Sequence, residues 1–346
     1  TGAGVVSSSN VDIDTLAPSA SIALGKSALK AGETTDVTVS FSEAVTGFDA
    51  SADLSVTSDA GTLGSFTSTD GGLTYVGTFT ASNSVSQTGN TITLANTGVA
   101  DAAGNAGTGT TVSAAFDTDG VRPTVSSIVL SDTSLSAGET TTVTITFSEA
   151  VSGLSVGDFS VEGGALTGLS TADSGTTWTA TFTPTSDVED GSNLITLAAE
   201  SVLDAAGNTN AAAASSGSYA IDTLRPTASV TLDKASLKAG EMATVTITFS
   251  EVVDDLEDVD LIVVGSGALS ALTQDSGNGA VWTATFTPTA DIEDASTVVQ
   301  LTASGITDAA GNTGAGVVSS SNVDIDTLAP TLAVSQIVDG DADNLV

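Results

Sequence analysis

The stretch Ile221-Asp222-Thr223-Leu224-Arg225-Pro226 recurs along the sequence and marks the boundaries of a long repeat. Close copies end at Pro18 and Pro330, and a version with two extra residues ends at Pro123. The four prolines, at positions 18, 123, 226 and 330, are 105, 103 and 104 residues apart. That spacing suits a whole domain of about 100 to 150 residues better than a solenoid repeat of roughly 20 to 50. The sequence therefore predicts separate domains joined by short linkers, in which proline restricts its own φ and the conformation of the residue before it.

Three full repeats and two partial segments follow from these boundaries. Residues 1–18 are identical to residues 313–330, so we expect the chain to open inside the tail of a preceding repeat. Residues 331–346 depart from the pattern of residues 19–36, and Asp339, Asp341 and Asp343 have the spacing of the first half of a calcium-binding loop. We therefore expect a different type of domain to follow. The predicted segments are 1–14 (tail end of a preceding repeat), 15–118, 119–222 and 223–326 (repeats 1, 2 and 3), and 327–346 (start of the following domain).

The composition excludes several classes of function. The chain has 42 acidic and 6 basic residues, a formal net charge of -36, which repels nucleic acid and anionic membranes. A hydrophobic fraction of 40% argues against disorder, because disordered chains combine high charge with low hydrophobicity. Cysteine and histidine are absent, so disulfides, thiolate metal sites and histidine-based catalysis are excluded. No apolar run approaches the roughly 20 residues of a membrane helix. We therefore expect a monomeric, non-enzymatic protein without nucleic-acid or membrane-inserting function, whose partners are the neighbouring repeats.

The hydrophobic pattern within each repeat indicates β-structure. Short stretches rich in Val, Ile and Thr alternate apolar and polar residues, and clusters of Gly, Asp, Asn and Ser separate them. A period of two indicates strands, and several short strands at this spacing indicate a sandwich. The sequence predicts an all-β chain of three tandem immunoglobulin-like β-sandwich domains, about seven strands each, in an elongated rod. In repeat 2 the expected strands A to G are 124–131, 140–148, 158–162, 165–171, 176–183, 193–199 and 217–222.

Two further recurring features have structural interpretations. Trp178, Trp282 and Tyr75 stand at matching places near the start of strand E, and we expect them to anchor the core rather than to stack on a ligand. The motif Ala-Gly-Glu at 31–33, 137–139 and 239–241 is expected to form the A-to-B turn, with glycine supplying the turn conformation. No function is assigned to this turn.

Acidic residues from three separate segments are expected to meet at the incoming end of each repeat. Because successive strands alternate in direction, the B-to-C and F-to-G loops lie beside the incoming linker. A glutamate follows strand B in the triplet Phe-Ser-Glu, the F-to-G loop reads Asp-Ala-Ala-Gly-Asn, and the linker adds aspartates. The candidate ligands are Asp14, Glu43, Asp101 and Asn105 for repeat 1; Asp117, Asp119, Glu149, Asp204 and Asn208 for repeat 2; and Asp222, Glu251, Asp308 and Asn312 for repeat 3.

A second acidic group is expected at the outgoing end, in the E-to-F loop that faces the next linker. Repeat 1 has Ser84, Ser86 and Gln87 in that region, so we expect its outgoing junction to bind fewer ions or to bind them less tightly. The members of this group are Asp187, Glu189 and Asp190 in repeat 2 and Asp291, Glu293 and Asp294 in repeat 3, with Asp324 and Asp326 in the linker that follows.

Such a convergence of carboxylates favours a calcium site. Like charges repel unless a cation lies among them, and Ca²⁺ takes six to eight oxygen ligands at about 2.3 to 2.6 Å. We therefore expect several Ca²⁺ ions, mainly at the junctions between repeats. Two alternatives stay open: the loop residues act only as turn formers, or Arg122 and Arg225 of the linkers form salt bridges with the carboxylates, each worth under about 1 kcal/mol.

The combined motifs carry a resemblance. The Asp-Thr-x-x-Pro junction, Ala-Gly-Glu before a strand that ends in Phe-Ser-Glu, and the Asp-Ala-Ala-Gly-Asn loop resemble the bacterial immunoglobulin-like repeats of giant surface adhesins. The resemblance implies a calcium-stiffened extender, or stalk, that holds a ligand-binding region away from the cell in adhesion or biofilm formation. It also implies an extracellular, cell-surface location and type I secretion of the RTX kind. The alternatives are an Ig-like module that binds a glycan or protein, and a surface-layer or matrix protein. A carboxylate-pair glycosidase would need a cleft, which nothing in the sequence indicates.

Overall fold

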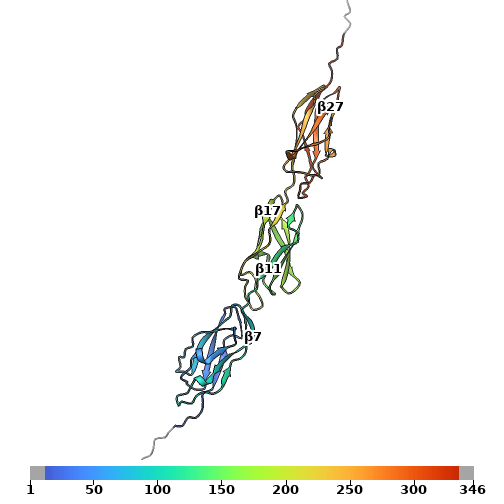
Figure 1. The fold of residues 1–346 in the computed structure, drawn as a ribbon. Helices are drawn as coiled ribbons and strands as arrows, with labels where there is room; N and C mark the ends of the chain where they lie inside the picture. Colours follow the sequence, from blue (N-terminus) through green and yellow to red (C-terminus); the bar gives the residue numbers. More distant parts are fainter. Residues whose placement is uncertain (1–11, 335–346) are drawn as a thin grey trace, which may run out of the picture.

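The computed structural model describes residues 12–334 of the chain, so the predicted half-loop at 339–343 lies outside the described residues. Three β-sandwiches follow one another in an elongated arrangement, each built from one continuous part of the sequence (Figure 1). The predicted fold class, three tandem immunoglobulin-like β-sandwich domains, is confirmed. Within residues 12–334, no helix is long and apolar enough to cross a membrane.

Repeat 2 shows the strand arrangement most simply. Its first sheet is antiparallel and has the order A-B-E-D. In the opposite layer the second half of strand A pairs in parallel with strand G, and strand F pairs with strands G and C. The first sheet is β11 (Val125–Leu130), β13 (Thr141–Phe147), β16 (Thr177–Pro184) and β15 (Gly164–Thr171), and the opposite layer is β12 (Ser134–Leu135), β20 (Tyr219–Asp222) and β17 (Glu189–Asn193), continued by β14 (Phe159–Val161), β18 (Ile195–Leu197) and β19 (Ala214–Ser215).

Repeats 1 and 3 have the same order of strands. Short helical turns differ between the repeats and lie in the B-to-C or F-to-G loops. The elements of repeat 1 are β1 (Ala20–Leu24), β3 (Thr34–Phe41), β6 (Thr74–Ala81) and β5 (Gly61–Leu63) against β2 (Ala28–Lys30), β10 (Phe116–Asp119), β7 (Ser86–Asn90), β4 (Leu54–Val56), β8 (Ile92–Ala95) and β9 (Thr110–Val112), with α1 (Ala50–Asp53) and η1 (Asn96–Gly98). In repeat 3 the first sheet is β21 (Ala228–Leu232), β23 (Ala243–Phe249), β27 (Asn278–Pro288), β25 (Gly267–Leu269) and β26 (Thr273–Asp275). The opposite layer is β22 (Ser236–Lys238), β30 (Val323–Asp326), β28 (Glu293–Thr302), β24 (Leu261–Val264) and β29 (Val317–Ser319). The helical turn η3 (Asp258–Asp260) belongs to repeat 3, and η2 (Val156–Asp158) belongs to repeat 2.

The expectation that residues 187–190 and 291–294 form loops is wrong for part of each segment, since Glu293 and Asp294 begin strand β28. Glu189 and Asp190 begin strand β17, which pairs with the outgoing strand β20. The apolar pattern does not indicate this strand, because only its last residue, Asn193, is buried and its polar residues show no alternation. Asp187 lies in the preceding turn with a φ of 57°.

Each sandwich encloses its own hydrophobic core. Phe79, Phe182 and Phe286 of strand E are fully buried, and burying a side chain of this size stabilises the fold by roughly 1.5 to 3 kcal/mol. Trp178 and Trp282 pack against the core but are only partly buried, as is Tyr75. The aromatic residues therefore close the core at its edge, in agreement with their predicted structural role.

Candidate metal centres at the incoming end of each repeat

Three carboxylates meet at the incoming end of every repeat. In each group one oxygen per residue can be chosen so that all three lie within 4.8 Å of one another. One member comes from the linker, one from the loop after strand B and one from the F-to-G loop. We call these groups the carboxylate triads; they are Asp14, Glu43 and Asp101; Asp119, Glu149 and Asp204; and Asp222, Glu251 and Asp308.

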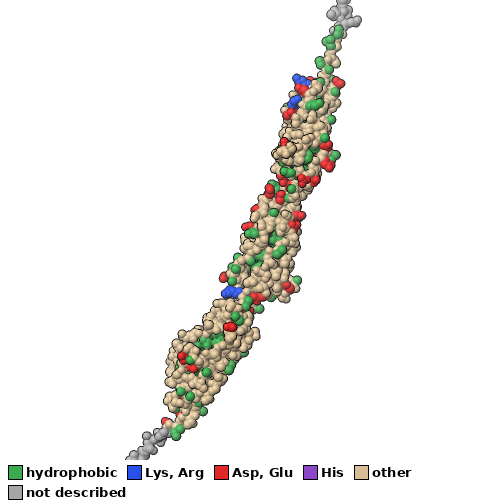
Figure 2. Space-filling model, viewed as in Figure 1, with side chains coloured by type: hydrophobic (Ala, Val, Ile, Leu, Met, Phe, Trp, Pro, Cys, Tyr) green, Lys and Arg blue, Asp and Glu red, His purple; other side chains and the backbone are tan. Residues whose placement is uncertain are grey.

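Two of the triads join neighbouring repeats. Asp222 is the last residue of β20 in repeat 2, whereas Glu251 and Asp308 belong to repeat 3. Asp119 likewise ends β10 of repeat 1 and meets Glu149 of repeat 2. Figure 2 shows acidic side chains gathered where repeat 2 meets repeat 3. An ion held by a triad would therefore contact both repeats at once.

The F-to-G loop fixes its aspartate through hydrogen bonds inside the loop. Asp204 is 5% exposed, and its Oδ1 accepts from the backbone N–H groups of Ala206 and Asn208, each at 2.8 Å. Its Oδ2 accepts from Asn208 Nδ2 at 2.8 Å. In repeat 1, the same bonds from Asn105 lower the pKa of Asp101. The loop thus holds its buried carboxylate in one orientation, and in repeat 1 its hydrogen bonds favour the ionised form of Asp101.

The pKa of the glutamate in each triad is shifted in the opposite direction, upward. Burial raises the pKa of Glu43, Glu149 and Glu251, and the neighbouring aspartates raise it further. Glu251 Oε1 is buried without a hydrogen-bond partner among the described residues. A cation among these oxygens would remove the repulsion and supply the missing partner.

The asparagine of the F-to-G loop faces the preceding repeat. Asn208 Oδ1 accepts from the backbone N–H of Ala31 at 2.8 Å, and Asn312 Oδ1 accepts from that of Ala137 at 2.7 Å. The role of Asn105, Asn208 and Asn312 as metal ligands stays a prediction. The sequence pattern did not connect the Ala-Gly-Glu turn with this loop, although both motifs recur in every repeat.

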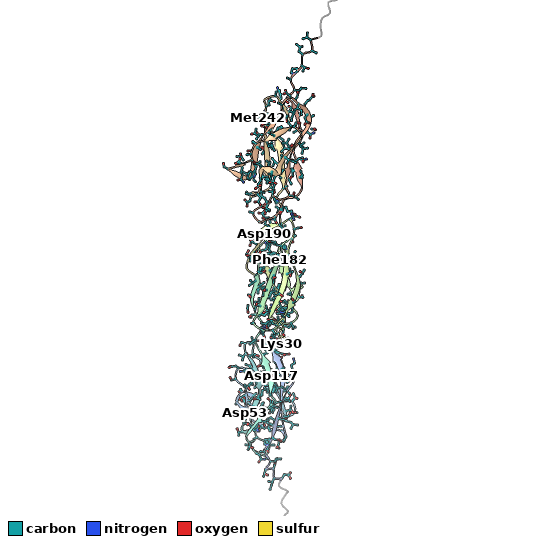
Figure 3. The ribbon with its side chains drawn as sticks, turned by 90° about the vertical axis from the view of Figure 1, so that its right-hand side faces the viewer. Lys30, Asp53, Asp117, Phe182, Asp190 and Met242 are labelled. Carbon is teal, nitrogen blue, oxygen red and sulfur yellow. The ribbon has the colours of Figure 1, made fainter. Side chains whose placement is uncertain are left out.

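The longer junction after repeat 1 uses Asp119 in its triad. Asp117 lies two residues earlier in β10, where its Oδ1 accepts from the backbone N–H of Gly89 at 2.8 Å, and it belongs to none of the three triads. The distance to the linker proline could have identified the aspartate that joins each triad, because Asp14, Asp119 and Asp222 each stand four residues before that proline. Figure 3 labels Asp117 beside Lys30, within repeat 1.

The second predicted acidic group lies near the triads without forming one of them. Glu189 stands opposite Asp222 in the β17 to β20 pairing, and its charge contributes to the raised pKa of Glu251. Asp190 Oδ1 accepts from the backbone N–H of Ser192 at 3.0 Å.

In repeat 3 the same group borders the outgoing end. Glu293 stands opposite Asp326, and hydrogen bonds from Ser296 and Thr297 lower the pKa of Asp294 to about 2. Asp291 has a φ of 53°, and Asp324 pairs with strand β22. Any metal contact made by these residues stays a prediction.

The linker arginines do not neutralise the triads among the described residues. The guanidinium Nη1 of Arg225 donates to the carbonyl oxygen of Thr313 at 2.8 Å, and Arg122 Nη1 donates to Thr209 Oγ1 at 3.3 Å. The single ion pair found within residues 12–334 joins Lys26 to Glu33. The arginines therefore fasten the linkers to the F-to-G loops and leave the carboxylates available.

The family of the chain follows from its sequence. The bacterial Ig-like domain family matches residues 14–118, 119–221 and 222–325, and the chain belongs to this family in three tandem copies. Each match begins at or beside the linker aspartate of a triad.

The comparison with solved structures gives distant likenesses. The Escherichia coli adhesin FdeC is 16% identical over 89% of this chain and 96% of its own, with a TM-score of 0.33. The Yersinia pseudotuberculosis adhesin InvE is 17% identical over 65% of this chain and 66% of its own (TM-score 0.23), and a marsupial T cell receptor is 11% identical over 84% and 96% (TM-score 0.32). A search of curated proteins gave no match.

Proposed function

We propose that this chain is a calcium-rigidified extender segment of a bacterial cell-surface adhesin. The observation that carries the proposal is the threefold recurrence of a carboxylate triad, two of which combine a linker aspartate with two acids of the next repeat. The segment would project a ligand-binding region away from the cell and would have no enzymatic activity. Secretion by the type I route and a role in biofilms belong to the same proposal and rest on the sequence resemblance.

The mechanism is mechanical. Without a cation the carboxylates of Asp222, Glu251 and Asp308 repel one another, which loosens the junction and widens the range of angles between the two repeats. With Ca²⁺ the same oxygens share one ion and fix the angle between the repeats. Mg²⁺ prefers an octahedral shell with retained waters, so it should replace Ca²⁺ poorly.

A calcium titration followed by melting and small-angle scattering tests the proposal. Ions that bind only the folded, docked form stabilise it by about 2.7 kcal/mol per site at a hundredfold excess over Kd. We expect a higher melting temperature and a longer, narrower distance distribution with Ca²⁺ than with chelator. Equal melting temperatures and equal maximum dimensions in the two conditions would overturn the proposal.

A further inference from the structure

The Ala-Gly-Glu turn at the outgoing end of a repeat contacts the next repeat directly. The backbone N–H of Ala31 donates to Asn208 Oδ1, and that of Ala137 donates to Asn312 Oδ1, across 177 and 175 residues of sequence. The linker after repeat 1 is two residues longer, yet the contact is the same at both junctions. It therefore depends on the turn and the loop, and not on the length of the linker.

The loop holds its carboxamide ready for this contact. Asn312 is 2% exposed, and its Nδ2 donates to Asp308 Oδ2 and to the carbonyl oxygen of Asp222, each at 2.9 Å. Both hydrogens of the amide thus have acceptors, which directs Oδ1 toward the preceding repeat. An acceptor fixed in this way needs little ordering when the two repeats dock.

The Ala-Gly-Glu turn presents the matching hydrogen-bond donor. Glu139 N donates to the carbonyl oxygen of Ser136 at 3.2 Å, and Gly138 has a φ of 86°, as in a type II turn. Glu139 Oε2 also accepts from Ser136 N at 2.8 Å, which fastens the turn. The closed turn leaves the N–H of Ala137 pointing away from its own repeat. Glu241 closes the turn of repeat 3 in the same way.

The turn of repeat 3 and the F-to-G loop of repeat 1 are the two halves of this contact, carried by the two outer repeats. Ala239 in the turn of repeat 3 is exposed, whereas Ala31 and Ala137 are partly buried. At the other end Asn105 is partly buried, whereas Asn208 and Asn312 are buried.

A neighbouring lysine adds a second contact. Lys30 Nζ donates to the carbonyl oxygen of Gly207 in the next F-to-G loop at 3.4 Å. Repeat 3 has Lys238 at the position of Lys30. The outgoing end of repeat 3 therefore offers two hydrogen-bond donors, the Lys238 ammonium and the backbone N–H of Ala239. The F-to-G loop of a repeat of this kind carries the two matching acceptors, a glycine carbonyl oxygen and the asparagine Oδ1.

We propose that the Ala-Gly-Glu turn is a socket for the asparagine of the next F-to-G loop, and that this contact aligns successive repeats without a metal ion. The turn of repeat 3, Lys238 to Glu241, forms the same socket, which fits the Asp-Ala-Ala-Gly-Asn loop of any repeat of this kind placed after it, although the sequence predicts a different type of domain at that position. The metal then rigidifies a junction that the socket has already aligned.

Hydrogen exchange and a proline substitution, both in chelator, test the socket in the existing chain. The Ala137 amide should exchange at least about fivefold more slowly than the Ala239 amide, the factor that corresponds to a net hydrogen-bond contribution of about 1 kcal/mol. Ala137→Pro removes this N–H, while proline is favoured at the second position of such a turn. We expect it to broaden the distribution of angles between repeats 2 and 3, whereas the matched control Ala239→Pro leaves that distribution unchanged.

The outcomes separate the socket from the metal site. Equal exchange of the Ala137 and Ala239 amides, or an unchanged junction in Ala137→Pro, would overturn the socket whether or not calcium binds. Calcium binding that fails while the Ala137 amide stays protected would overturn only the proposed function. If Ala137→Pro does not fold, the exchange comparison in the unaltered chain still decides.

An extended chain tests the partner. Because residues 1–18 repeat residues 313–330, residues 1–330 followed by 19–118 place a copy of repeat 1 after repeat 3 with a linker already present in the sequence. We expect the Ala239 amide to become protected in chelator. Asn105→Ala in the added repeat should abolish that protection. An Ala239 amide that exchanges equally fast in both extended chains would show that the turn does not select this loop.

Discussion

The two described junctions balance similar triads in different ways. Between repeats 1 and 2, Ser86 stands opposite Asp119 in the β7 to β10 pairing, and the ammonium of Lys30 reaches the next loop. Between repeats 2 and 3, Glu189 stands opposite Asp222, and Ser136 replaces Lys30. Each junction has a linker arginine, Arg122 or Arg225, so the first junction has a lysine in addition and the second adds a fourth carboxylate.

This difference distinguishes the alignment of neighbouring repeats from the neutralisation of the carboxylates between them. Both junctions share the contact between the turn and the loop asparagine, so both can be aligned without a cation. Only the second places Glu189 beside its triad, where the glutamate adds to the repulsion that raises the pKa of Glu251. In Figure 2 basic side chains are visible beside acidic ones at the first junction, whereas the second junction shows acidic side chains. The second junction should therefore depend more strongly on calcium.

The largest expected effect is a difference between the junctions on chelation. Removing Ca²⁺ should widen the angle distribution between repeats 2 and 3 severalfold more than that between repeats 1 and 2. Because the chain contains no cysteine, pairs of cysteines can be introduced for fluorescence energy transfer across one junction at a time. Equal widening at the two junctions would show that Lys30 and Glu189 do not set the calcium dependence.

Substitution of the linker aspartates should give the next largest effect. Asp222→Ala removes a triad member outside either core, so each sandwich should stay folded while the calcium-dependent stiffness of its junction is lost. Asp119→Ala should do less, because the first junction holds fewer carboxylates. Asp117→Ala is the matched control, since Asp117 lies outside the triads. Scattering in calcium, with far-ultraviolet spectra to confirm folding, measures the series. An Asp222→Ala chain as long and rigid as the parent would contradict the bridging role.

Much of this comparison can be read from the sequence. Strand alternation predicts that Glu251, Asp308 and Asp222 meet in one corner, because loops after strands of the same direction share an end of a sandwich. The difference between Ser86 and Glu189 is visible there too. In the strands of the first sheet the apolar alternation marks each boundary to within one residue for β11, β13 and β16.

Other features cannot be read in this way. The division of strand A into β11 and β12 leaves no mark in the apolar pattern, because both halves bury alternate residues. The contact between Ala31 and Asn208 depends on backbone geometry, since any residue but proline supplies an N–H at that position.

Exchanging Lys30 of the first junction and Ser136 of the second, which occupy the same position, should have a smaller effect on the angle distributions. Ser136→Lys would place an ammonium beside the carbonyl groups of the loop around Asp308, as Lys30 does at the first junction. We expect it to narrow the angle distribution of the second junction in chelator, by a contribution under about 1 kcal/mol because the side chain is exposed. Lys30→Ser should broaden the first junction by a similar amount. No change in either variant would assign the difference between the junctions to Glu189 alone, and Glu189→Ser would test that.

The smallest expected effect is a dependence on pH that changes sign with calcium. Burial, together with Asp308, Asp222 and Glu189, raises the pKa of Glu251 above its ordinary 4.5 in the docked form. The docked form therefore binds a proton more tightly than the open form, so in chelator docking should strengthen as the pH falls toward 4.5.

With calcium present the sign should reverse, because protons compete with the ion for the same oxygens. The comparison must stay above about pH 4.5, since Asp173, whose pKa hydrogen bonds lower to about 2, loses its stabilising contribution as the pH falls from 3.8 toward that value. Glu251→Gln should remove most of the pH dependence of the second junction in chelator, and Glu149→Gln should do the same at the first. The amplitude should be larger at the second junction, where Glu189 adds to the charge around Glu251. A second junction that opens further on acidification in chelator would show that the triad is not a repelling group of carboxylates, and the case for a cation among them would lose its electrostatic basis.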